Sequence, residues 1–170
     1  LLRPRKFHAY CIGIAKSGTV SAWGMFNSHY RSAHEKTRQM VVDLMIRRLN
    51  GKVTSKTVKK QLKHRDRELH LEMESSNLLA MFAPELSDLF PKARFLLTVR
   101  DPRSWLKSII NQHLNIDVSN RPADKLLRQL LFKPPGITYT SGEQELERMG
   151  LFPVDGYLKA WATHYQKALD

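Results

Sequence analysis

A lysine, two hydroxyl residues and a glycine stand together where a short apolar stretch ends. The stretch is predicted to be a buried β-strand over Phe7–Ile14, and it is followed by Lys16, Ser17, Gly18 and Thr19. Backbone N–H groups at the start of a helix, together with the helix dipole, favour a bound phosphate or sulfate. The glycine lets the backbone approach closely, and the lysine adds a full positive charge. These residues predict an anion site at the start of the next helix.

The order of residues in this loop disfavours one common kind of phosphate site. A Walker A loop places its lysine after its second glycine, next to Ser or Thr, whereas Lys16 precedes Gly18. An ordinary magnesium-dependent nucleotide triphosphatase is therefore not expected. A capped strand–helix turn with an incidental lysine remains the alternative interpretation of this loop.

A second junction between a predicted strand and a predicted helix carries similar residues. A strongly apolar strand over 93–99 runs into Arg100, Asp101 and Pro102. Asp101 suits the N-cap of the following helix, and Pro102 suits its first position. Ser108 lies further along that helix, so Arg100 and Ser108 could hold one phosphate between them. A surface arginine and a serine turned to water are the alternative, which the first junction makes less favourable.

Strands alternate with helices along the chain, which predicts an α/β fold with a central parallel sheet. The expected strands are 7–14, 69–74 and 93–99, and the expected helices are 21–28, 36–50, 78–90, 103–114, 124–132 and 157–169. In an open sheet of this kind, ligands bind at the carboxyl ends of the strands, so both junctions point to one edge. With only three strands and a helix at its end, the chain is expected to be a single domain over 1–170 that lacks a C-terminal part.

The charge of the chain predicts an anionic partner. The formal net charge is +12 and the pI is about 10.0, which fits nucleic acid, acidic lipid, or a phosphorylated or sulfated ligand. Much of this charge lies in 52–67, which is expected to be an exposed basic helix or a mobile excursion, and more often a solvated face than a binding surface. A single cysteine, Cys11, and the lack of a signal-peptide or transmembrane pattern predict a cytoplasmic location.

The two junctions together resemble the sulfotransferase family that uses 3′-phosphoadenosine 5′-phosphosulfate (PAPS). The first family motif reads Pro-Lys-Ser-Gly-Thr-Thr, and residues 15–20 here read Ala-Lys-Ser-Gly-Thr-Val. The second reads Arg-Asn-Pro with a serine eight residues after the arginine; here Asp101 replaces the Asn between Arg100 and Pro102, and Ser108 is that serine. The resemblance extends from Phe7 to about residue 114. The glycine-rich loop that the family carries near its C-terminus has no match after Ser108.

The resemblance implies a three-layer, P-loop-like α/β fold and an activity. A sulfuryl group would pass by in-line transfer from PAPS to a hydroxyl or amine acceptor, leaving PAP, with no metal and no specific nucleic acid; the oligomeric state stays open. Arg100 and Ser108 would hold the 3′-phosphate. The 5′-phosphosulfate would be held by the first loop and the start of its helix, in the set Lys16, Ser17, Gly18, Thr19, Val20 and Ser21.

The family resemblance also directs attention to a general base. Some sulfotransferases use a glutamate soon after the first helix, and Glu35 best matches it, with His34 as the second choice because its unperturbed pKa suits proton transfer. Both residues could instead be exposed loop residues. His70, Glu72 and Glu74 on the second expected strand are further candidates.

Two other functions compete with sulfuryl transfer. One is a P-loop-like nucleotide or nucleoside kinase, against which the position of Lys16 argues. The other is a non-enzymatic module that binds polyanions through 52–67, which predicts salt-sensitive binding that does not need Lys16.

Overall fold

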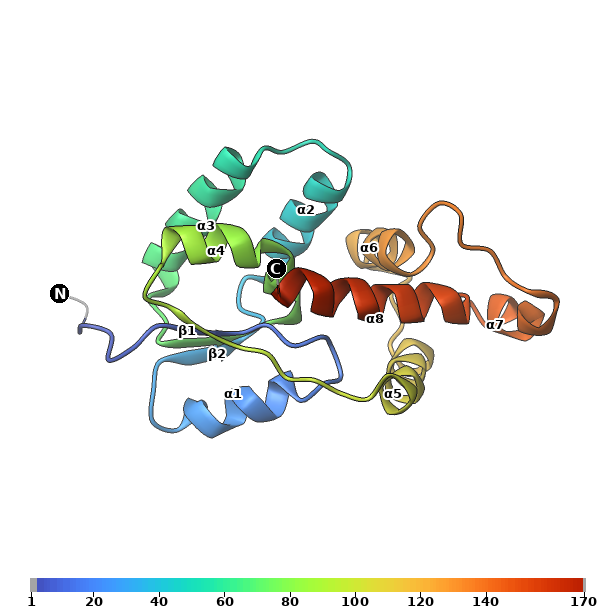
Figure 1. Cartoon of the computed structure of the whole chain (residues 1–170), viewed down its shortest axis with the longest axis horizontal. Helices are drawn as coiled ribbons and strands as arrows, with labels where there is room; N and C mark the ends of the chain where they lie inside the picture. The colour runs from blue at the N-terminus through green and yellow to red at the C-terminus, as the bar shows by residue number, and fades with distance from the viewer. Residues whose placement is uncertain (1–2, 170) are drawn as a thin grey trace.

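The computed structural model describes residues 3–169, and its centre is a four-stranded, all-parallel sheet (Figure 1). The strand order is β2-β3-β1-β4, and the strands are β1 (Ala9–Cys11), β2 (Ser32–His34), β3 (Met73–Ser75) and β4 (Arg94–Leu96). Because all pairings are parallel, the carboxyl ends of all four strands meet at one edge. The predicted α/β class with a central parallel sheet flanked by helices is confirmed.

Helices cover the sheet on both faces, as a parallel sheet requires. The helix α1 (Thr19–Asn27) lies on one face, and α2 (Arg38–Leu49), α3 (Ser55–Leu69) and α4 (Ala83–Leu89) lie on the other (Figure 1). The 3₁₀ helix η1 (Asn77–Phe82) connects β3 to α4. These elements and the four strands are referred to below as the sheet half of the molecule.

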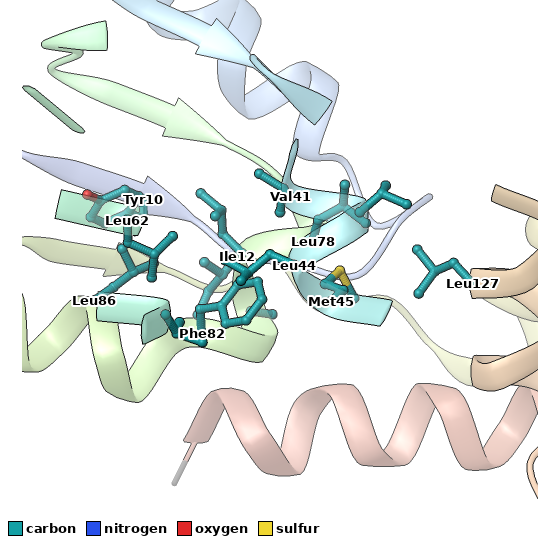
Figure 2. Close-up of a cluster of buried hydrophobic side chains, with 14 residues drawn as sticks. Tyr10, Ile12, Val41, Leu44, Met45, Leu62, Leu78, Phe82, Leu86 and Leu127 are labelled. Carbon is teal, nitrogen blue, oxygen red and sulfur yellow. The ribbon is translucent and has the colours of Figure 1, made fainter. Parts of the chain in front are cut away.

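The main hydrophobic core fills the face of the sheet under α2, α3 and α4 (Figure 2). Side chains of β1, α2, α3, η1 and α4 meet there, among them Ile12, Val41, Leu62, Phe82 and Leu86. Val58 and Leu62 are the apolar stripe of the basic segment, and both are buried. The sequence of α3 therefore supplies just enough apolar side chains to attach an otherwise charged helix to the core.

Four helices and a further 3₁₀ turn follow β4 and pack beside the sheet, forming the helical half of the molecule (Figure 1). Their bounds are α5 (Pro102–Asn115), α6 (Pro122–Phe132), η2 (Ser141–Glu143), α7 (Gln144–Arg148) and α8 (Val154–Leu169). A second core holds them together around Trp105, Ile109 and Tyr157. Gly156 is required in α8 because a Cβ there would collide with the carbonyl oxygen of Phe132 at the end of α6.

The sequence prediction was wrong about β2, β3 and the helix that follows β3, and it did not expect η2 or α7. The strand β2 was not expected, because Ser32–His34 is short and carries no run of branched apolar residues. The strand expected over 69–74 begins only at Met73, since Leu69 still belongs to α3. The helix expected over 78–90 is divided into η1 and α4, and the break falls next to Pro84, which has no N–H to donate.

No helix within residues 3–169 is both long enough and apolar enough to cross a membrane.

Candidate functional site

The loop between β1 and α1 has an unusual backbone. Lys16 has φ 68° and Gly18 has φ 107°, so two of its residues are left-handed. The first hydrogen bond within α1 runs from the N–H of Ala22 to the carbonyl of Gly18. The N–H groups of Thr19, Val20 and Ser21 precede it and find no acceptor within residues 3–169. The side chain of Lys16 is exposed beside these donors.

The loop lies directly against the end of β4. The hydroxyl of Ser17 donates to the carbonyl of Ile14 at 2.6 Å and lies 2.7 Å from the hydroxyl of Thr98. Gly13 is required at this contact, because a Cβ there would collide with Thr98 Oγ1. The first predicted anion loop and the strand that leads to the second junction are therefore in contact.

Arg100 joins the two junctions. Its Nη1 donates to the carbonyl of Lys16 at 2.9 Å, and its Nε donates to the hydroxyl of Ser104 at 3.3 Å. Asp101 caps α5 as predicted, accepting from the N–H of Ser104 at 2.9 Å. Ser108 lies one turn further along α5 and is half-buried, and its hydroxyl has no hydrogen bond to any residue of 3–169. The structure thus brings Arg100 to the first loop, and Ser104 rather than Ser108 is its present hydroxyl partner.

Aromatic side chains hold both junctions in place from the helical half. Trp105 is fully buried and donates from Nε1 to the carbonyl of Ala15 at 2.8 Å. In α8, Trp161 donates to the carbonyl of Arg100 at 3.1 Å, and Tyr165 bonds to both the carbonyl of Thr98 and the N–H of Arg100. Burial raises the pKa of Tyr165, so this hydroxyl keeps its proton.

The two candidate bases lie in different surroundings. Glu35 directly follows β2, and its carboxylate accepts from Nε of Arg38 at 3.2 Å. His34 points to α1 instead, with its ring 6.3 Å from that of Trp23, and its Nε2 is buried without a hydrogen-bond partner within 3–169. Of the pair, Glu35 is the one that lines a cavity.

The further candidates on β3 and before it have structural partners. Glu74 is buried and forms a two-point ion pair with Arg65 of α3, also buried. Glu72 accepts from the backbone N–H groups of Lys6 and Arg31, which lower its carboxyl pKa. His70 ends α3, and its Nε2 lies 3.2 Å from a backbone carbonyl oxygen. These residues lie away from the loop of Lys16.

Two cavities lie between the sheet half and the helical half. The first has a volume of about 240 Å³ and is mainly apolar, with walls from Ile14, Trp105 and α8. The second, here called the polar cavity, has a volume of about 270 Å³ and is lined by Ala15 of the first loop, by Glu35, and by side chains of α2, α5 and α6. The polar cavity is therefore bordered both by Ala15, the residue before Lys16, and by Glu35.

Sequence reasoning missed several residues that shape this region. Thr98, Trp105 and Tyr165 support the loops, and Gln112 and Arg128 line the polar cavity. The tryptophan is a core residue as expected, but its hydrogen bond to the loop could not be foreseen. The position of Thr98 at the carboxyl end of a predicted strand, two residues before Arg100, was the one signal available for any of them.

Comparison with known families agrees with this geometry. A family model described as a sulfotransferase domain matches residues 10–140, which include both junctions, Glu35 and the polar cavity. No curated protein gives a significant match to the chain. The chain belongs to the sulfotransferase domain family, whose general activity is the transfer of a sulfuryl group.

Proposed function

We propose that this protein transfers a sulfuryl group from PAPS to a hydroxyl or amine acceptor. The observation that carries the proposal is the row of unpaired N–H groups at Thr19, Val20 and Ser21. The exposed Lys16 lies in the same loop, and its carbonyl accepts a hydrogen bond from Arg100. Such a row is suited to an anion of several oxygens. When bound, PAPS supplies the sulfuryl group and departs as PAP.

The residues present fit the two ends of this donor. The N-terminus of α1, with Ser17, Gly18 and Lys16, would hold the 5′-phosphosulfate. Lys16 would place its ammonium group near the bridging oxygen, where negative charge grows during transfer. Arg100 and Ser108 would hold the 3′-phosphate. Since the half-buried hydroxyl of Ser108 has no partner within residues 3–169, it is free to donate.

Glu35 would act as the general base. A base must lie within hydrogen-bond reach of the proton that it removes, and Glu35 borders the polar cavity that Ala15 also lines. Arg38 fixes the direction of the Glu35 carboxylate by its hydrogen bond of 3.2 Å. The proton of the acceptor hydroxyl would pass to this carboxylate as the acceptor oxygen bonds to sulfur. His34 is less suited, because its ring faces α1.

Calorimetry with PAP tests the donor site. We expect wild-type protein to bind PAP with a Kd below about 1 mM, and Lys16→Ala or Arg100→Ala to weaken binding at least about tenfold, or about 1.4 kcal/mol. Because Lys16 has a positive φ, Lys16→Asn is the better-tolerated second variant. Sulfuryl transfer should fall by about 10² to 10³-fold in either Lys16 variant.

The control for this experiment is Lys92→Ala. Lys92 is exposed and precedes β4, so it lies at the opposite end of the strands from the loop of Lys16. Its loss should leave PAP binding unchanged. The donor site would be refuted if Lys92→Ala weakened PAP binding as much as Lys16→Ala and Arg100→Ala do, or if PAP bound tightly to protein that lacks Lys16 and Arg100.

A further inference from the structure

The polar cavity has an excess of positive charge. Three guanidinium groups, those of Arg38, Arg121 and Arg128, share it with two carboxylates, those of Glu35 and Asp124. His113 also lines it, but burial lowers the pKa of this ring to about 4, so the imidazole is neutral near pH 7. One positive charge is therefore left without a partner among the lining groups.

The two carboxylates are used mainly by Arg38. Its Nη1 lies 2.5 Å from the buried Asp124, and its Nε lies 3.2 Å from Glu35. Arg121 reaches Asp124 only at 3.6 Å and remains half exposed. The ion pairs thus satisfy Arg38 fully and Arg121 weakly.

Arg128 is the unpaired group. It projects from α6, is half-buried, and has no salt bridge to any carboxylate of residues 3–169. Burial, followed by the charges of Arg121 and Arg38, lowers its pKa, although Asp124 acts in the opposite direction. A partly buried guanidinium among like charges is costly unless an anion joins it. A carboxylate, phosphate or sulfate group suits its planar donor pattern.

Gln112 lies in the wall of the same cavity and also has an unpaired polar atom. Its side-chain amide oxygen is buried without a hydrogen-bond partner within 3–169, and the residue lines the polar cavity. A buried amide oxygen with no donor destabilises the fold. Because this oxygen has almost no accessible surface, a ligand in the cavity does not reach it, and recognition of the ligand depends on the guanidinium groups.

Resting on the proposed function, we propose that the acceptor is a small hydroxylated molecule that carries an oxyanion group. Arg128, assisted by Arg121, binds the oxyanion in the polar cavity, and the reacting hydroxyl lies toward Glu35. The volume of about 270 Å³ limits this part of the ligand to a small molecule or to one unit of a longer one. Specificity arises because a neutral analogue would leave the guanidinium group unpaired.

Calorimetry with four molecules of one scaffold tests this assignment. The probes are glucose, glucuronate, glucose 6-phosphate and glucose 6-sulfate, at constant ionic strength, with and without PAP. At least one anionic probe should bind about tenfold more tightly than glucose, and the one that does identifies the oxyanion as carboxylate, phosphate or sulfate. Arg128→Gln should remove this preference, and Arg128→Lys should restore part of it.

Arg47→Gln is the matched control. Arg47 is exposed on α2, the helix of Arg38, and does not line the polar cavity. The proposal is overturned if no anionic probe binds better than glucose at up to about 10 mM, or if the preference survives in Arg128→Gln with an unchanged Tm. PAP binding separates the two proposals. If PAP binds but no anionic probe is preferred over glucose, only the acceptor class is refuted. If anionic probes bind through Arg128 but PAP does not bind, only the donor is refuted.

Discussion

The exposed face of α3 and the polar cavity are both positively charged, but they differ in what the charges face. α3 presents Lys56, Lys60, Lys63 and Arg67 to water. Lys59, on the same helix, pairs with the exposed Asp88 at 2.7 Å. Water and salt screen such charges, so each is worth little to stability.

The polar cavity holds fewer charged side chains than α3, but water screens them less. Its arginines are partly removed from water and are held by buried groups such as Asp124. Arg128 lies among them without a carboxylate of its own within residues 3–169. The number of basic residues in a segment therefore does not locate a binding site, and an unpaired charge beside a cavity is the more specific indication of one.

The largest effect is expected from the one buried charge of α3. Arg65→Met should lower the free energy of unfolding by about 3–5 kcal/mol, because it leaves Glu74 charged and buried without its partner. Urea denaturation measures this loss, and Lys60→Met on the exposed face is the control. A loss below about 1 kcal/mol would mean that α3 is held by its apolar stripe alone.

The next effect concerns the cavity carboxylate. Glu35→Gln should lower kcat by about 10²-fold or more, because the amide cannot take the proton of the acceptor. The Kd for PAP should stay within about twofold, since Glu35 is placed on the acceptor side. Transfer assays and calorimetry measure the two quantities. If His34→Gln instead lowered kcat by this factor while Glu35→Gln stayed active, His34, at the end of β2, would be the general base.

The pH dependence of stability should also differ between the polar cavity, which contains His113, and the exposed face of α3, which contains His64. The pKa of His113 is lowered to about 4 from 6.5 by burial and then by the charge of Arg128. The unfolded chain therefore binds this proton at a higher pH than the folded protein, so stability is lost as pH falls from 6.5 toward 4. We expect this ring to account for about 2 kcal/mol between pH 7 and pH 5.

His113→Asn keeps a polar atom near Tyr157, which lies 2.8 Å from Nδ1 of His113, and should make the acid sensitivity shallower. His64→Asn is the control on α3, where the ring is mostly exposed. Urea denaturation at several pH values makes the comparison. Parallel pH profiles for wild type and His113→Asn would contradict the assignment.

The smallest effect is expected on the exposed face of α3. The triple variant Lys56→Gln, Lys60→Gln, Lys63→Gln should change the free energy of unfolding by less than about 0.5 kcal/mol per site. Transfer to a small acceptor should change by less than about twofold. A large, salt-dependent loss of binding to heparin or nucleic acid in this variant alone would instead identify α3 as a polyanion surface.

Local patterns predicted much of the fold and both junctions. The apolar runs of β1 and β4, the helical stripes, and the cap by Asp101 all follow from neighbouring residues. The polar cavity did not follow, because Arg38, Gln112 and Arg128 are brought together by packing between the two halves of the molecule. The strand β2 was missed for the same reason: pairing with β3, not its own composition, makes Ser32–His34 a strand.

One consequence of α8 concerns how the protein is made on the ribosome. Its Trp161 and Tyr165 bond to the backbone at Thr98 and Arg100, and His164 lies 2.8 Å from the carbonyl of Ile12. A nascent chain that has emerged from the exit tunnel only as far as Phe152 contains β1 to β4 and both junctions, but it lacks α8 and therefore lacks these hydrogen bonds. The two junctions should therefore take up their folded positions only after α8 (Val154–Leu169) has left the exit tunnel.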